Sequence, residues 1–156
     1  PEQSISHGIT TFVAQNRGAG RKERIRKGFR RGLMLEACYW VFICITITLF
    51  RRPLMGLFVT AGNEGIVALG SSYLGLMALF YVFPAFTNGI QGFFRGMGNM
   101  SVTLLGTFVQ TSLRVVFVYL LTPGIGLLGV AYACAIGWSV MLLVEVPYYF
   151  WFMKDK

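Results

Sequence analysis

Long apolar runs separated by short polar breaks dominate the pattern of this chain. Four of them are long enough to cross a bilayer as helices: 33–50, 66–94, 101–122 and 127–152. At about 1.5 Å per residue, the shortest reaches about 27 Å, close to the hydrocarbon thickness of a membrane. A shorter apolar segment over 4–16 predicts a partial span. The expected fold is all-α, a polytopic membrane helix bundle with one partial and four complete transmembrane helices.

Prolines and small residues indicate how these helices bend and pack. Pro84 lies in the middle of the run 66–94 and predicts a kink, because proline cannot donate a backbone hydrogen bond. The segment 123–126 predicts a tight turn between the last two spans. Gly92 and Gly96 form a pair of small residues one helical turn apart, which predicts that a neighbouring helix approaches closely there.

Composition supports a membrane protein over a soluble domain. The chain is 55% hydrophobic and only 13% charged, whereas soluble domains carry about 25% charged residues. Cys38, Cys44 and Cys134 all lie inside apolar runs without metal-ligand spacing, so we predict neither a disulfide nor a metal site, and no cofactor. The chain begins at Pro1 without a signal-peptide pattern, and we expect it to be a piece of a longer protein.

Positive charge is concentrated between the partial span and the first complete one. Segment 17–32 holds eight of the fourteen Lys and Arg residues and predicts a basic cytoplasmic loop, or a short helix on the membrane surface. Arg24, Lys27 and Arg31 share one helical face there and could meet anionic headgroups. The apolar runs that follow disfavour a nucleic-acid partner. In this topology eleven basic residues lie on the side of the loop and two lie on the opposite side. This excess predicts a multi-pass plasma (inner) membrane protein with the loop and the carboxyl terminus in the cytoplasm.

Arg114 is the strongest functional candidate, because a cation near the centre of a span costs about 2.5–3.5 kcal/mol or more. It shares one helix face with Gln110 and several threonines. We expect it to pair with those groups, or with an acid from elsewhere in the protein, and to hold the polar interior. A snorkelling arginine is the alternative.

Two acids and one histidine also lie in the apolar segments. Glu36 is interpreted as an interfacial acid paired with Arg30 or Arg31. Glu145 and His7 are weak candidates for coupling to Na⁺ or H⁺, because intramembrane ionisable groups often mark ion pathways. The alternative for His7 is a hydrogen bond in helix packing, and the alternatives for Glu145 are a protonated group, a paired group or exposure to a cytoplasmic vestibule.

Polar and aromatic side chains of the middle runs could line a substrate cavity, with amides to orient a ligand and rings to attract a cation. These candidates are Tyr73, Tyr81, Asn88, Gln91, Gln110 and Arg114. Packing or exposure to lipid is the alternative for each aromatic residue. Since no His, Asp and Glu cluster converges on one face, we predict no catalytic residue and no enzyme.

Several motifs resemble the multidrug and toxic compound extrusion (MATE) transporters. The matching stretches are 12–20 with the basic run behind it, 70–74, 89–98 and the pair Leu113 and Arg114. The family's cytoplasmic turn motifs correspond here to Gln15, Asn16, Gly18, Gly20, Arg95, Gly96 and Gly98. The resemblance covers nearly the whole chain.

The resemblance implies half of a twelve-helix, two-lobe antiporter that exports amphiphilic or cationic compounds in exchange for Na⁺ or H⁺. This chain resembles the carboxyl-terminal lobe, with an amino-terminal lobe as the alternative, and its partner would be the missing lobe. Asn99 stands where the family often has Asp, and segment 71–94 has no acid, which favours the DinF-like branch. A flippase for lipid-linked precursors and a non-transporting membrane scaffold are the alternative functions.

Overall fold

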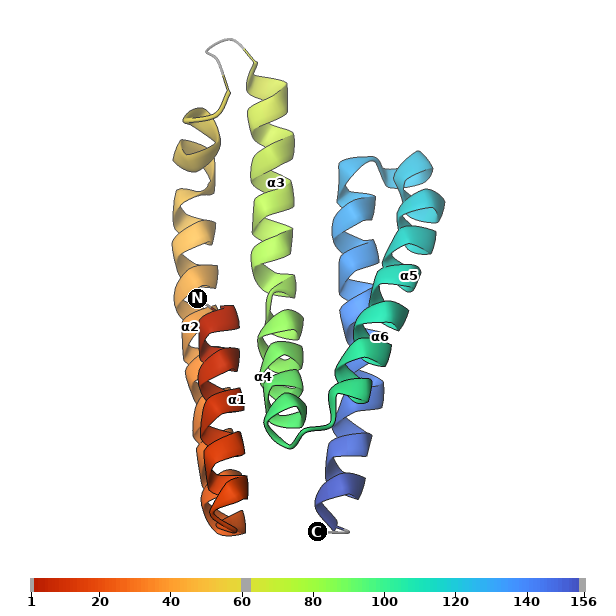
Figure 1. The fold of residues 1–156 in the computed structure, drawn as a ribbon. Helices are drawn as coiled ribbons and strands as arrows, with labels where there is room; N and C mark the ends of the chain where they lie inside the picture. The colour runs from red at the N-terminus through yellow and green to blue at the C-terminus, as the bar shows by residue number, and fades with distance from the viewer. Residues whose placement is uncertain (1, 60–62, 155–156) are drawn as a thin grey trace.

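The structure, a computed structural model, describes residues 2–59 and 63–154, and all regular structure in these ranges is helical (Figure 1). The helices are α1 (Glu2–Gly18), α2 (Lys22–Gly56), α3 (Glu64–Phe80), α4 (Val82–Gly96), α5 (Met100–Ile125) and α6 (Leu127–Lys154). Helices α2, α5 and α6, and the consecutive pair α3–α4, are each long and apolar enough to cross a membrane. The prediction of an all-α membrane helix bundle is confirmed.

For segment 17–32 the predicted loop is wrong and the helical alternative is right from Lys22 on, but the helix is not a separate short one, because α2 begins at Lys22 and continues without a break into the first complete span. Arg, Lys and Glu all favour helix, and the Lys27 ammonium lies 2.7 Å from the Glu23 carboxylate one turn away. Ile25 and Phe29, also one turn apart, are buried against the bundle. This packing extends the helix beyond the apolar run.

Two prolines have opposite effects on their helices. The predicted kink near Pro84 is confirmed, since the helix is interrupted at Tyr81 between α3 and α4. Proline offers no N–H to the carbonyl of Phe80 and its ring crowds that oxygen, which explains a break at this level. The turn predicted over 123–126 is wrong in extent, because α5 continues through Pro123 and only Gly126 separates it from α6.

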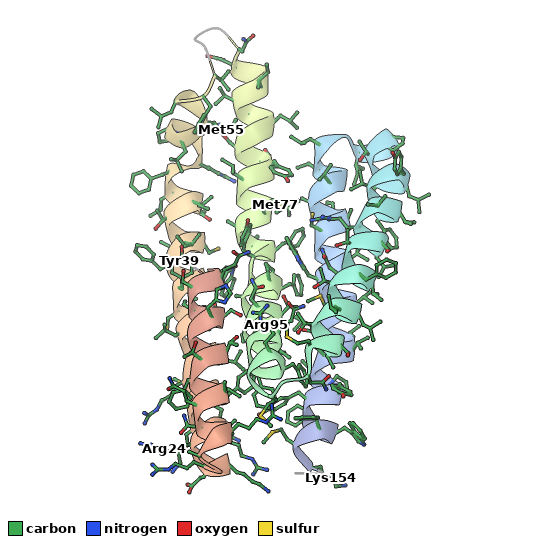
Figure 2. All side chains as sticks on the ribbon, viewed as in Figure 1. Arg24, Tyr39, Met55, Met77, Arg95 and Lys154 are labelled. Atoms are coloured by element: carbon green, nitrogen blue, oxygen red, sulfur yellow. The ribbon has the colours of Figure 1, made fainter. Side chains whose placement is uncertain are left out.

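Helix α4 is the centre of the bundle and contacts α1, α2, α5 and α6. In Figure 1, α1 lies alongside the first half of α2 on one side of α4, and α5 and α6 form an antiparallel pair on the other. Figure 2 shows Arg24 and Lys154 at the same end of the bundle and Met55 near the opposite end. The basic start of α2 and the end of α6 are therefore on the same side.

The core is aromatic and lies toward that same end. Phe93 and Phe94 of α4 are fully buried, and their rings are 5.5 Å apart. The ring of Phe93 also lies 4.9 Å from the ring of Phe29 and 4.9 Å from that of Tyr149. These contacts connect α2, α4 and α6 through one side-chain cluster.

The predicted close approach at Gly92 and Gly96 is confirmed, and the approaching helix is α1. A Cβ atom on Gly92 would lie 2.6 Å from the Ser6 carbonyl oxygen, and one on Gly96 would lie 2.7 Å from that of Thr10. Real Cβ atoms do not come so near to backbone oxygens. The two helices can pack at this distance only because both positions lack a side chain.

We predict that Gly92→Ala destabilises the protein, because the new methyl group would displace the α1 backbone. Overpacking of this kind costs about 1–3 kcal/mol. Thermal unfolding in detergent measures the effect. Gly8→Ala is the matched control, since a Cβ there meets nothing within 4 Å. Equal unfolding temperatures for the two variants would contradict the proposed contact.

Candidate functional site

The two turn motifs found in the sequence end α1 and α4 in the same way. Each helix is followed by a glycine in the left-handed region, Gly20 with φ 68° and Gly98 with φ 74°. After each glycine, the next backbone N–H donates to a carbonyl five residues earlier, at 2.9 Å after α1 and 2.8 Å after α4. This is the Schellman arrangement, which favours glycine at that position. The glycines therefore shape the turns.

The structure brings these two turns into contact. The Arg17 guanidinium, from the first turn, donates a hydrogen bond to the Met97 carbonyl oxygen of the second. Asn16 is buried, and its amide donates to the Phe12 carbonyl oxygen at 2.8 Å. Gln15 and Gly18 are exposed. The sequence pattern indicated the motif but gave no sign that Arg17, one of many basic residues there, joins the two turns.

Arg95 turns back from the end of α4 into the interface with α1 (Figure 2). Its Nη2 atom donates to the Ser6 hydroxyl at 2.7 Å, and this hydroxyl donates to the Asn88 carbonyl oxygen at 2.5 Å. Arg95 is half-buried and Ser6 is fully buried. The sequence analysis did not identify Ser6, because a single serine in an apolar segment carries no distinctive signal.

Two candidates predicted separately form a buried pair between α4 and α6. The Gln91 amide nitrogen donates to Glu145 Oε1 at 3.2 Å and lies 3.8 Å from the Met141 sulfur. Glu145 is 1% exposed. Its second oxygen, Oε2, has no hydrogen-bond partner among residues 2–59 and 63–154. A carboxyl group in the interior is therefore only half satisfied.

A second group of polar side chains lies farther along the bundle, around α6, which contacts α3 on one side and α5 on the other. The Arg114 guanidinium interacts with the thiol of Cys134, and Tyr73 lies within electrostatic range of that thiol and of Tyr81. The Tyr81 ring is also 6.1 Å from that of Trp138. Tyr73, Tyr81 and Arg114 thus lie apart from the Gln91 and Glu145 pair, and the six predicted cavity residues do not form one site.

The remaining cavity candidate on α5, Gln110, is buried against α6. The Thr111 hydroxyl donates to its side-chain oxygen at 3.3 Å, and a Cβ on Gly137 would lie 3.0 Å from its backbone carbonyl oxygen. The polar face predicted on this span thus points into the bundle at Gln110. Arg114, predicted to pair with Gln110 and the threonines, interacts instead with the Cys134 thiol of α6.

Glu36 corrects the sequence interpretation. It is fully buried, and neither carboxylate oxygen has a hydrogen-bond partner within the described part of the chain. Arg30 and Arg31 are exposed instead of paired with it. Helical geometry explains the difference, because these residues lie five and six positions away, on other faces of α2. His7 is exposed on α1.

A cavity of about 310 Å³ lies between α5 and α6, next to the Gln91 and Glu145 pair. Its lining residues are Asn99, Ser101, Val102, Leu105, Gly106, Val109, Met141, Val144, Glu145 and Tyr148. The six residues predicted to line a substrate cavity are not among them. The sequence could not indicate this, since it shows which polar groups face inward but not where packing leaves space.

The comparisons with known proteins agree with this geometry. The family model MatE matches residues 1–120. The chain belongs to the MATE family. It is 32% identical to the probable multidrug resistance protein NorM of Thermotoga maritima. The 132 matched residues make up 83% of this chain and 28% of that protein. The protein of the same name in Bacillus subtilis is 27% identical over 107 residues, 69% of this chain and 23% of that one.

Solved MATE structures share the fold. An inward-facing multidrug resistance MATE transporter superposes with a TM-score of 0.85 and 24% identity, over 94% of this chain and 33% of its own. A MATE protein in a bent conformation superposes with a TM-score of 0.86 and 23% sequence identity, and the match covers 99% of this chain and 34% of that protein. This MATE chain thus spans about a third of the solved structures and about a quarter of the curated relatives.

We predict that Arg17→Ala lowers stability, because it removes a hydrogen bond that joins the turn after α1 to the turn after α4. Hydrogen bonds to a charged donor contribute about 1.5–3 kcal/mol. Unfolding temperature in detergent is the measurement, and Arg24→Ala is the control, since Arg24 is exposed on the same basic segment. A loss no larger than that of the control would show that the contact between the turns contributes little.

Proposed function

We propose that this chain is the carboxyl-terminal lobe of a secondary antiporter of the plasma membrane. The antiporter exports amphiphilic or cationic drugs and toxic compounds in exchange for Na⁺ or H⁺, and the basic start of α2 and the end of α6 face the cytoplasm. One observation carries the proposal: the relative with 32% identity over 83% of this chain is named a probable multidrug resistance protein. The order and packing of the helices also match MATE transporter folds.

The buried polar groups support a transport role. Charged side chains within membrane spans are costly and typically mark ion or substrate pathways. Here Glu36, Glu145 and Arg114 all lie in membrane-length helices, and Glu145 borders a cavity. Transporters of two related lobes bind substrate between the lobes and rock about that site. One lobe therefore holds only part of the pathway, and its partner is the other lobe.

The alternatives fit this lobe less well. A flippase for lipid-linked precursors needs a strongly basic interior, but Arg114 is engaged with a thiol and Arg95 with a hydroxyl group. A membrane scaffold gives no reason to keep a half-satisfied carboxyl group in the core. The absence of a candidate acid between residues 71 and 94 favours the DinF-like branch, where the coupling acid lies in the other lobe.

We predict that the full-length protein lowers ethidium accumulation in cells without other multidrug exporters, and that residues 1–156 alone do not. A lobe by itself lacks half of the pathway between the lobes. Ethidium fluorescence measures accumulation, with immunoblots of membrane fractions to match expression. Collapsing the Na⁺ gradient or the proton gradient separately then identifies the coupling ion. Efflux that is unaffected by either treatment would argue against a secondary antiporter.

A further inference from the structure

The cavity between α5 and α6 contains one half-satisfied acid. Glu145 lines it, with Oε1 bonded to the Gln91 amide at 3.2 Å and Oε2 without a partner in the described residues. Burying a carboxylate in an apolar region without a cation is strongly unfavourable. A ligand that brings a positive group to Oε2 would supply the missing partner.

Gly106 lies beside both the cavity and the carboxyl group. It lines the cavity, and a Cβ on it would lie 3.0 Å from Glu145 Oε1 and 3.8 Å from the Gln91 amide nitrogen. Any larger residue at this position of α5 would therefore occupy the space next to the acid. Glu145 Oε2 is itself buried, so a ligand reaches it only with a small movement of the side chain, for which the missing side chain at Gly106 leaves room.

The other walls are apolar and open toward the outside of the bundle. Leu105 and Val144 both line the cavity and are 66% and 62% exposed, so its mouth faces the outside of the described bundle. At the end near the α4–α5 turn, the Asn99 amide donates to the Tyr148 hydroxyl at 3.1 Å. The Tyr148 ring adds an aromatic surface, which attracts quaternary ammonium groups.

We propose that this cavity binds an amphiphilic organic cation, with its positive group on Glu145 and its apolar part along Leu105 and Val144. The observations that fit this ligand are a buried acid with a free oxygen, an apolar entrance and an aromatic wall. The site deepens the proposed export function, on which its use in transport rests. It lies between two consecutive helices of this chain.

The test is photolabelling of the full-length protein in lipid nanodiscs with an alkyltrimethylammonium probe that carries a diazirine in its chain. We expect labelled peptides from α5 and α6. Glu145→Gln keeps an acceptor for Gln91 but removes the charge, and should lower this labelling by about tenfold or more, as expected when a buried charge pair loses one partner. Glu64→Gln, an exposed acid at the start of α3, should leave it unchanged.

Two further measurements keep the result clear. Leu105→Trp retains Glu145 and closes the mouth of the cavity, so it should also abolish labelling even if Glu145→Gln folds poorly. A probe with a hydroxyl head in place of the ammonium should label wild type and Glu145→Gln equally. Labelling elsewhere, or labelling of α5 and α6 that is unaffected by both variants, overturns the site. Absence of labelling, as when a lipid chain or another segment of the protein fills the cavity, also overturns it.

Ethidium efflux by the same variants separates the two proposals. Labelling that depends on Glu145 in a protein without any efflux would support the binding site and overturn the proposed function. Efflux by a protein whose α5 and α6 are not labelled would support the function and overturn the site.

Discussion

The close approach of α1 and α4 is the constraint on which the rest of the structure depends. Helices in a bilayer gain no hydrophobic energy from meeting each other, so their association relies on packing and interhelical hydrogen bonds. Gly92 and Gly96 allow the backbone of α4 to reach that of α1, and Arg95 then reaches Ser6 at 2.7 Å. The same approach brings the turns after α1 and α4 together through Arg17.

Helix α4 transmits this constraint to the other side of the bundle. Once one face of α4 is fixed on α1, its aromatic residues must face α2 and α6, where Phe93 packs against Phe29 and Tyr149. Gln91 then faces Glu145 of α6. The polar pair is thus held by a rigid helix with close packing on both sides, which is the arrangement that a binding group needs to keep its geometry.

The polar groups between the helices fall into two kinds with different roles. Arg17, which is exposed, donates to a carbonyl oxygen, and half-buried Arg95 donates through Nη2 to a hydroxyl group, and these bonds across the α1–α4 interface stabilise the fold. Glu36 and Glu145 retain oxygens without partners in residues 2–59 and 63–154, and a buried polar atom without a partner is unfavourable for folding. Such unfavourable groups are typical of functional sites. Glu145 also borders the cavity between α5 and α6.

The sequence by itself determined the helical bundle, the kink near Pro84 and the close packing at Gly92 and Gly96, because hydropathy, proline and small residues act locally along a helix. It did not reveal that α2 begins at Lys22, that Glu36 is buried or that Gln91 meets Glu145, 54 positions away. Only the tertiary structure decided these points. Partners far apart in sequence, and the space left between their helices, depend on how whole helices rotate and pack.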